Sequence, residues 1–480
     1  MNVQNHFGIG KIGAFLKSSL LLALLFIFVQ GCVRPPNDRT PDGRVIVQYW
    51  EKWTGFEGDA MQAVVDDFNA SQTNIFVDKL TVSQIDRKLM LSTAGGNPPD
   101  VAGLWSFNIF VYSEKNALMP LDSMLAEAGI TRDHYIPVFW DLCKHHGFMW
   151  GLPSTPATLA LHWNKKMFRE AGLDPDRPPL SIAELDAMAE KLTIVNVVRN
   201  GNRVRVRFSD LTPEEKKDKN FDILQMGFSP NEPGWWNPMW GYWFGGDLWD
   251  GDRKITANSP QNCEAMRWFQ NYPKKYGLEN MRTFGSSFGN FSSPQNPFIS
   301  GQVAMVLQGV WMYNFIDKFA PNMEWAVAPF PSVDPEKYPD VTIAESDVLV
   351  IPRGARHPKE AFEFIKFVNS QAPMEKLCLG QRKFSPLAVM SDDFAQKHPN
   401  PYIKTFIRLA KSPQAKTTPR MSVWNILSDE LIVACGQLSE LLKTPEEALD
   451  QVQKRTQWKM DRVMRRWDMV EEERIKEWSK

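Results

Sequence analysis

The sequence lacks the short motifs through which many enzymes hold phosphate, a catalytic metal ion or an activated nucleophile. It has no G-x-S-x-G, no G-x-x-x-x-G-K-[ST], no G-x-G-x-x-G after an expected strand and no H-E-x-x-H. The acidic segment 247–252 lacks the alternating acids and the closing Glu of a calcium loop. We therefore expect no catalytic residue, no metal ion and no cofactor.

An excess of one charge and closely spaced cysteines are also absent. The 55 basic and 56 acidic side chains give a formal net charge of -1 without a long block of one sign, so nucleic acid is not an expected partner. No C-x-x-C pair indicates a zinc site. Besides Cys32 there are four cysteines, for which disulfides and free thiols both stay open: Cys143, Cys263, Cys378 and Cys435. The adjacent His145 and His146 are expected at a hairpin edge, on the surface rather than on a metal.

The N-terminal segment has the pattern of a secretory signal. Two lysines precede ten consecutive apolar residues, about half of the roughly twenty that a membrane-spanning helix needs. The segment after this run resembles the lipobox of bacterial lipoproteins at Gly31 and Cys32 and departs from it at the two positions before them. We predict a signal peptide over residues 1–31, a lipid such as palmitate on Cys32, and a Pro-rich tether over 32–43 that holds the protein to a membrane. A plain secreted protein and an uncleaved anchor are the alternatives.

Tryptophan is abundant, with 18 indoles among 480 residues. Five of them fall within fifteen residues, in a segment rich in Gly, Pro and Asn: Trp235, Trp236, Trp240, Trp243 and Trp249. Such a density of large rings is difficult to bury completely. We therefore expect some of these rings to face a ligand.

Hydrophobic periodicity predicts alternating strands and helices from about residue 44 onward. Three segments have the composition of buried strands: 44–49, 74–82 and 100–104. Two stretches between them carry apolar residues at helical spacing: 61–68 and 85–93. This β-α-β opening predicts an α/β fold with mainly parallel sheets flanked by helices.

Indoles follow several of the expected strands. In open parallel sheets, ligands bind beyond the carboxyl ends of the strands, and those ends are followed here by Trp50, Trp53, Trp105 and Trp311. A sugar ring offers apolar C–H faces that lie well on an indole, while its hydroxyls need carboxylate, amide or guanidinium partners. Nearby or later in the chain are the polar candidates Glu51, Asn108, Asp247 and Arg382. Solvated surface charge is an equal alternative for Glu51 and Arg382.

The order of short segments along the chain resembles that of the family 1 extracellular solute-binding proteins. The resemblance covers about residues 45–463 and is carried by these segments: 49–55, 94–101, 118–122, 151–153, 159–168, 171–175, 245–247, 298–305, 309–311, 328–331 and 361–367. The most specific is LALHWNKKMF at 159–168, which AGLDP follows. The resemblance implies a two-lobed fold of the periplasmic-binding-protein type II class, with an interlobe cleft and a hinge.

By this resemblance the first lobe comprises residues 44–154 and 341–390, and the second comprises 155–340 and 391–480. Nine matched positions are expected to line the cleft: Trp50, Glu51, Trp53, Trp105, Trp235, Trp236, Trp240, Trp311 and Trp424. The polar segment 199–220 has no counterpart in the family and is expected to be an exposed insertion.

The function implied by the resemblance is that of the extracytoplasmic substrate-binding component of an ABC importer. The expected ligand is a neutral mono- or oligosaccharide, which the protein delivers to permease subunits in the membrane. An exported glycoside hydrolase stays open as an alternative, because its two carboxylates can come from anywhere in the chain. An adhesive surface lipoprotein is the third interpretation.

Overall fold

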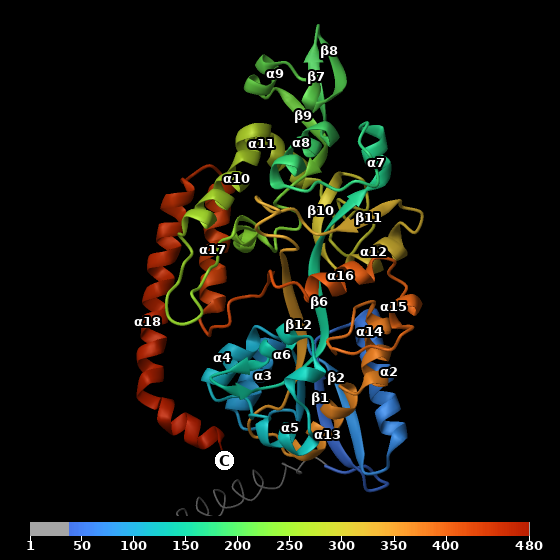
Figure 1. The fold of residues 1–480 in the computed structure, drawn as a ribbon, viewed down its shortest axis with the longest axis vertical. Coiled ribbons are helices and arrows are strands. Elements are labelled where there is room, and N and C mark those ends of the chain that lie inside the picture. The colour runs from blue at the N-terminus through green and yellow to red at the C-terminus, as the bar shows by residue number, and fades with distance from the viewer. Residues whose placement is uncertain (1–37, 480) are drawn as a thin grey trace, which may run out of the picture.

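A computed structural model describes residues 38–479. The predicted signal peptide, Cys32 and residues 32–37 of the predicted tether lie outside them. The described chain forms an elongated molecule with two lobes along its long axis (Figure 1). One sheet of eleven strands runs through both lobes in the order β2-β1-β3-β12-β6-β10-β9-β7-β8, with β11 beside β6 and β13 beside β12.

The first lobe, in the lower half of Figure 1, is built on a parallel arrangement of three strands with helices around it. Its strands are β1 (Val45–Glu51), β2 (Ile75–Thr81), β3 (Val101–Trp105), β4 (Lys144–His145) and β5 (Phe148–Met149). Its helices are α2 (Gly55–Ser71), α3 (Ile85–Ala94), α4 (Asn108–Glu114), α5 (Asp122–Ala128), η1 (Arg132–His134), α6 (Pro137–Asp141), α13 (Pro358–Val368) and α14 (Gln371–Gln381). The strands and helices expected between residues 44 and 104 are therefore confirmed.

The second lobe occupies the upper half of Figure 1. Its strands are β7 (Ile194–Arg199), β8 (Asn202–Arg207), β9 (Phe221–Phe228), β10 (Val303–Gly309), β11 (Trp325–Ala328) and β13 (Ala415–Lys416). Its helices and those between the lobes are α7 (Lys165–Glu170), α8 (Ile182–Leu192), η2 (Phe208–Asp210), α9 (Pro213–Asp218), η3 (Asn237–Phe244), α10 (Pro260–Tyr276), α11 (Leu278–Ser286), α12 (Met312–Phe319), α15 (Phe394–Lys397), α16 (Ile403–Ala410) and α17 (Trp424–Ser439).

Two long strands cross from one lobe to the other, β6 (Leu152–Asn164) and β12 (Thr342–Val350). They pair antiparallel with each other, β12 also pairs antiparallel with β3, and β6 pairs antiparallel with β10. Parallel pairing is confined to β1 with β2 and β3, β9 with β10, and β12 with β13. The sheet is therefore mixed, and less parallel than the sequence predicted, because the crossing strands run against their neighbours.

Each lobe has its own hydrophobic core. Strand β6 contributes Ala160 to the first core and Leu161 to the second, so the two cores meet at the crossing strands. Phe394 and Phe406 pack into the first core although they follow the predicted boundary at residue 390. The two-lobed α/β architecture that the resemblance implied is confirmed.

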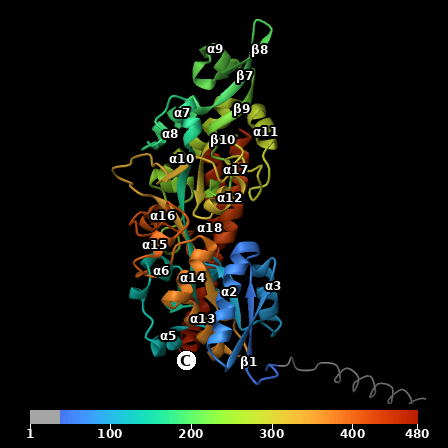
Figure 2. The same cartoon turned by 90° about the vertical axis from the view of Figure 1, so that its right-hand side faces the viewer.

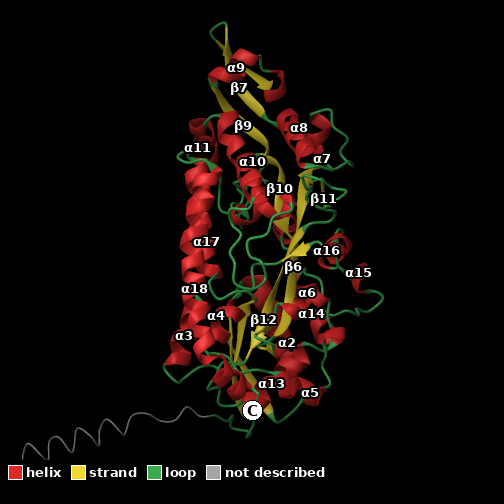
Figure 3. Cartoon of the chain, turned by 60° about the vertical axis from the view of Figure 1, so that its left-hand side comes forward, coloured by secondary structure: helices red, strands yellow, loops and turns green. Residues whose placement is uncertain are grey.

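The C-terminal helix α18 (Pro445–Trp478) lies alongside both lobes (Figures 1 and 3). Thr444 and Glu447 cap its start through the reciprocal hydrogen bonds of a capping box. Its first turns pack on the second core, whereas Trp467 and Trp478 near its end pack into the first core. This helix therefore joins the two lobes outside the sheet.

The segment 199–220 forms the tip of the second lobe, farthest from the first lobe (Figures 1 and 2). It contains β8, η2 and α9, and most of its side chains are exposed or half-buried. The expectation of a solvent-exposed insertion agrees with this position. Within residues 38–479 no helix combines the length and the apolar character that crossing a bilayer requires.

Candidate functional site

A cavity of about 680 Å³ lies between the two lobes, beside the crossing strands. Its lining comes from the ends of strands in both lobes, from β6 and β12, and from the start of α17: Trp53, Phe56, Glu57, Trp105, Phe107, Thr155, Ala157, Trp235, Trp236, Met239, Phe291, Ser292, Trp311, Phe315, Glu345, Ser346, Asp347, Lys383, Thr418, Trp424, Asn425 and Ser428. A volume of this order suits a ligand of several hundred daltons.

One group of aromatic rings in this lining comes from the first lobe. Trp53 follows β1 and Trp105 ends β3, and their rings lie edge to face with centroids 6.0 Å apart. Phe107 stacks on Trp105 at 5.8 Å with 6° between the planes. Because β1 and β3 are parallel neighbours, their carboxyl ends bring the two indoles to the same edge of the sheet.

A second group of rings comes from the second lobe. The ring centroids of Trp236 and Trp311 are 6.2 Å apart, and those of Trp235 and Trp236 are 6.1 Å apart. Phe291 extends the group, with centroid distances of 4.8 Å to Trp235 and 5.0 Å to Phe315. Among residues 38–479 no ring contact joins this group to the first, so the cavity separates two aromatic walls.

The position of Trp311 depends on a glycine at the end of β10. A Cβ atom at Gly309 would lie 2.3 Å from Cζ3 of the Trp311 ring. No other residue type leaves room for the indole to fold over the strand end in this way. Local sequence therefore determines that this ring faces the cavity.

Asp347 of β12 lies at the centre of a buried ion cluster beside the first aromatic wall. Its carboxylate is 3.1 Å from Lys52 Nζ and 3.5 Å from Lys383 Nζ. It also accepts hydrogen bonds from Trp53 Nε1 at 2.7 Å and from the Thr155 hydroxyl at 3.0 Å. Burial alone would raise the pKa of Asp347, but the two lysines outweigh it and hold the pKa below its ordinary value.

Two further carboxylates complete the cluster. Lys383 Nζ lies 2.9 Å from Glu57 Oε1, and Lys52 Nζ lies 3.6 Å from Glu51 Oε1. Burial would lower the pKa of Lys383, but Glu57 and Asp347 outweigh it and raise this pKa above its ordinary range. The cluster thus holds one more carboxylate than ammonium group, and Lys383, the cationic residue in the cavity lining, is already paired.

Glu345, two residues before Asp347, presents a half-buried carboxylate to the cavity. It accepts hydrogen bonds from the Ser106 hydroxyl at 2.8 Å and from the Thr418 backbone N–H at 2.9 Å. Burial raises the pKa of Glu345 above its ordinary value, because its hydrogen bonds only partly offset the lost hydration.

The sequence model of the family described as bacterial extracellular solute-binding protein matches residues 57–375, more than half of the chain. The chain belongs to this family. An uncharacterized ABC transporter extracellular-binding protein of Pyrococcus horikoshii is 24% identical over 381 residues, which are 76% of this chain and 80% of that protein. The maltotriose-binding protein of Pyrococcus abyssi is 19% identical over 85% of this chain and 79% of its own length.

Solved structures of the same class superpose on this solute-binding protein. The structure of CpMnBP1 with mannotriose bound has a TM-score of 0.71 and 27% sequence identity, and the match covers 86% of this chain and 100% of that one. The sugar-binding protein MalE of Xanthomonas citri has a TM-score of 0.68 at 18% identity. At 18% identity, the likeness to MalE is evidence for the fold and not for the ligand.

Six residues that the sequence suggested as ligand contacts line the cavity of this solute-binding protein: Trp53, Trp105, Trp235, Trp236, Trp311 and Trp424. Their side chains come from four strand ends or loops and from α17. Strand-exit position and the resemblance thus lead to rings of this lining, and that these rings contact a ligand stays a prediction.

Two other predicted contacts, both indoles, lie away from the cavity. Trp240 is only 1% exposed and packs in the second core against Trp243, Trp268 and Phe330. Trp50 packs against the first core, on the face of β1 opposite to Tyr49 and Glu51. Neither ring reaches the cavity, because each lies inside its element rather than at its exposed end.

The four polar candidates also lie behind or away from the cavity surface. Glu51 belongs to the ion cluster but is shielded, and its carboxylate accepts a hydrogen bond from the Tyr49 hydroxyl. Asn108 is buried and accepts from the Trp105 backbone N–H at 3.3 Å. Asp247 pairs with Lys416 on the surface at 2.9 Å. Arg382 caps α14 and does not line the cavity, whereas its neighbour Lys383 does.

Sequence reasoning missed the polar part of the lining, above all Glu345, Asp347 and Lys383. The sequence does mark Glu345 and Asp347. They lie two residues apart in the otherwise apolar segment 342–350, so in a strand they share one face. Charged groups in such a segment are buried and paired, which is common at functional sites.

The cysteines and the histidine pair are now placed. Cys143, Cys263, Cys378 and Cys435 are free and buried, so no disulfide joins them. His145 and His146 lie on the predicted hairpin, but both are half-buried beneath α18 rather than on the surface. The expectation of surface histidines was wrong because the C-terminal helix covers this hairpin.

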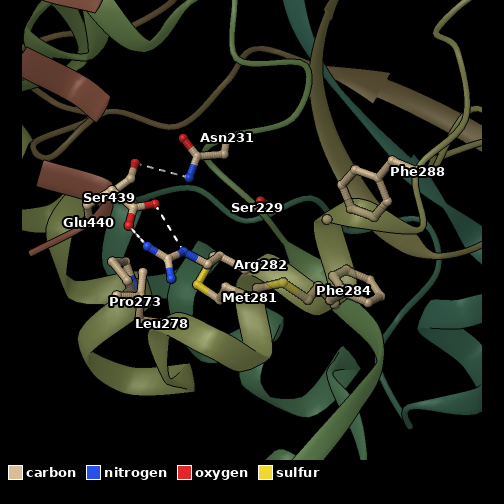
Figure 4. Close-up of a pocket in the computed structure, with 12 residues that line it drawn as sticks. Ser229, Asn231, Pro273, Leu278, Met281, Arg282, Phe284, Phe288, Ser439 and Glu440 are labelled. Carbon is tan, nitrogen blue, oxygen red and sulfur yellow. Dashed lines mark hydrogen bonds and ion pairs between the residues drawn. The ribbon is translucent and has the colours of Figure 1, made fainter. Parts of the chain in front are cut away.

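A second, smaller cavity of about 270 Å³ lies within the second lobe (Figure 4). Arg282 of α11 closes one side of it through an ion pair with Glu440, with Nε 3.2 Å from Oε1, and Asn231 donates to the Ser439 hydroxyl at 3.4 Å. It shares no lining residue with the interlobe cavity. The interlobe cavity is therefore the candidate ligand site.

Proposed function

We propose that this protein binds a neutral mono- or oligosaccharide between its lobes and delivers it to the permease of an ABC importer. The observation that carries this proposal is the pair of facing aromatic walls, Trp53 with Trp105 and Trp236 with Trp311, on either side of one cavity. Indole faces on both sides match the two apolar faces of a sugar ring.

The polar groups of the cavity favour a neutral ligand over an anionic one. Lys383 is held by Glu57 and Asp347, and Glu345 adds a further carboxylate. A phosphate or carboxylate on the ligand would meet no free cation among the described lining residues. Hydroxyl partners are available instead, since Asn425 and Ser428 line the cavity.

The named relatives support the same ligand class. CpMnBP1 was solved with mannotriose, and the Pyrococcus abyssi relative is a maltotriose-binding protein. Binding at a micromolar dissociation constant requires about 8 kcal/mol, which a few desolvated indole contacts and hydrogen bonds supply after association entropy is met.

The proposed cycle uses the crossing strands as the hinge. The first lobe would comprise residues 44–154 and 341–390, and the second would comprise 155–340 and 391–480. Bending near these lobe boundaries would close the cavity on the sugar. The closed form then docks on the permease. A lipid on Cys32 and the tether 32–43 would hold the protein at the outer face of a membrane after removal of residues 1–31.

The proposed role needs no catalytic residue, in agreement with the family. The rival glycoside hydrolase requires one carboxylate that attacks or activates water and one that donates a proton. Both oxygens of Asp347 are engaged by lysines, Trp53 and Thr155, which leaves this carboxylate unsuited to either role.

A thermal-shift assay with a panel of glycans tests the proposal. We expect an oligosaccharide such as mannotriose or maltotriose to raise the melting temperature, because a ligand at about 100 times its dissociation constant adds roughly 2.7 kcal/mol of stability. A phosphorylated sugar should give no larger shift. Trp311→Ala should abolish the shift, whereas Trp458→Ala, which removes a 52% exposed ring on α18, should retain it. A panel without any shift would refute the ligand class.

A further inference from the structure

Three metal-ligating side chains gather on the first lobe, outside the interlobe cavity. Glu114 ends α4, His145 ends β4, and His146 begins the turn of the β4–β5 hairpin. One possible ligand atom from each lies within 4.8 Å of the other two. His146 Nε2 is 3.7 Å from Glu114 Oε1, and the two imidazole centroids are 3.9 Å apart.

The hairpin turn explains how two consecutive histidines can face the same site. His146 and Gly147 both have left-handed backbone conformations, with φ of 49° and 85°. This pattern is that of a two-residue type I′ turn, in which the strict alternation of strand side chains ends. The His146 ring therefore returns toward the His145 ring instead of pointing to the opposite face.

The hydrogen bonds around His145 leave one of its nitrogens free as a ligand. The Ser113 hydroxyl lies 3.2 Å from the Phe110 carbonyl and 2.7 Å from His145 Nδ1, and when it donates to the carbonyl its oxygen accepts from Nδ1. In the neutral imidazole, a protonated Nδ1 leaves the lone pair on Nε2. An outer partner that fixes the tautomer in this way is typical of metal-binding histidines.

His146 and Glu114 are half-buried, and neither makes a side-chain hydrogen bond within the described residues. His146 Nε2 is inaccessible to solvent and has no hydrogen-bond partner. The Glu114 side chain is only 15% exposed, and within residues 38–479 its carboxylate accepts no hydrogen bond. A buried nitrogen without a partner, such as His146 Nε2, costs free energy, which a bound cation would offset.

The C-terminal helix covers the cluster. The Trp467 ring of α18 stacks on the His146 ring with centroids 3.7 Å apart and 13° between the planes, and Trp478 lies 6.3 Å from His146. These contacts hold the His146 ring in place and limit the access of bulk water, so the three groups form a partly enclosed site.

We propose that Glu114, His145 and His146 bind a divalent transition-metal ion of the Zn²⁺ type. Two imidazole nitrogens and one carboxylate oxygen form a donor set that Zn²⁺ accepts, with bonds of about 2.0–2.2 Å and a water as the fourth ligand. The three ligand atoms, which lie within 4.8 Å of one another, would have to approach to the spacing of roughly 3.3 Å that such a tetrahedron requires. The ion would join α4 to the hairpin on which the end of α18 docks. The site is independent of the sugar ligand.

Isothermal titration of the full chain with ZnCl₂ tests the proposal. The chain should carry Cys32→Ser, because a free thiol is itself a zinc ligand. We expect one ion per chain, no measurable binding by the double variant His145→Ala/His146→Ala, and at least tenfold weaker binding by Glu114→Gln. Ser113→Ala, which removes only the outer partner, should weaken binding by about 10- to 100-fold. His134→Ala, at an exposed histidine outside the cluster, should bind as the parent chain does.

Melting curves and far-UV circular dichroism without metal establish whether each variant is folded. If the double variant does not fold, the visible spectrum of the parent chain with Co²⁺ decides, since four-coordinate nitrogen and oxygen ligation gives stronger bands than hexaaqua Co²⁺. The absence of one-to-one Zn²⁺ binding would overturn the proposal. So would folded Glu114→Gln and Ser113→Ala variants that bind Zn²⁺ with unchanged affinity.

Discussion

Trp53 Nε1 donates a hydrogen bond of 2.7 Å to Asp347 Oδ2, which fixes an indole of the first lobe to a strand that crosses to the second. Thr155 of the other crossing strand donates to the same oxygen at 3.0 Å. One carboxylate thus connects the first aromatic wall to both crossing strands. The orientation of Trp53 and the integrity of the sheet between the lobes depend on the same buried charge.

Replacement of Asp347 by Asn should therefore lower the free energy of unfolding strongly. The amide keeps the size of the side chain but leaves Lys52 and Lys383 without their shared counter-charge, and breaking a buried ion pair costs about 3–5 kcal/mol. Urea denaturation followed by circular dichroism measures the loss.

The matched control for this variant is Asp247→Asn. Asp247 pairs with Lys416 at the surface, where an ion pair contributes at most about 1 kcal/mol. Equal losses of stability in the two variants would show that the cluster around Asp347 does not contribute as we describe.

Glu345 predicts a pH dependence of stability opposite to that of Asp347. The pKa of Glu345 is higher in the folded state than in the unfolded state. Between these two pKa values the folded state binds more protons, so the free energy of unfolding falls as pH rises through this window. Asp347 has a lowered folded pKa and therefore adds stability above its unfolded pKa, which is lost as pH falls through the folded value. Glu345→Gln should remove only the first effect.

The measurement is urea denaturation of the parent chain and Glu345→Gln between pH 4 and pH 8. We expect the variant to gain stability relative to the parent as pH rises, because Gln can still accept from the Thr418 backbone N–H without an ionisation cost. A difference that stays constant across this range would contradict the raised pKa of Glu345.

Trp240 and Trp311 should separate core packing from ligand binding. Trp240→Ala removes a ring that is 1% exposed and should cost about 3–5 kcal/mol of unfolding free energy. Trp311→Ala removes a half-buried cavity ring and should cost less stability but most of the ligand affinity. Calorimetric titration with a glycan that shifts the melt, together with urea denaturation, gives both quantities. The reverse pattern would place the ligand site elsewhere.

Local signals predict the α/β class and the indoles at strand ends, whereas the two-lobed arrangement is implied by the family resemblance. Trp53, Trp105 and Trp311 follow apolar strand patterns directly, and strand ends are where such sheets bind ligands. Trp240 lies in the same Trp-rich segment as Trp236, yet the 3₁₀ turn of η3 directs it into the core. Periodicity does not distinguish these two directions in a short irregular helix.

The polar centre of the site was not predictable in the same way. Asp347 and Lys383 are 36 residues apart in the chain, and Asp347 meets Lys52, and Lys383 meets Glu57, only after β12 is placed between β3 and β6. No local pattern encodes which charges share a buried cluster. The sequence therefore indicates Arg382, whereas Lys383 is the residue that lines the cavity and Arg382 ends α14 in a left-handed conformation.

The substitution Gly309→Ala tests how the second aromatic wall is positioned. A methyl group at residue 309 would lie 2.3 Å from the Trp311 ring, so Gly309→Ala must displace that ring from the cavity. We expect at least a tenfold loss of glycan affinity, together with the cost of about 1–3 kcal/mol in stability that overpacking typically brings. In a Trp311→Ala background the same methyl group meets no indole, so Gly309→Ala should then change affinity little. Calorimetric titration of the two single variants and the double variant completes the cycle, and fully additive losses would mean that Gly309 acts on the ligand by a route other than Trp311.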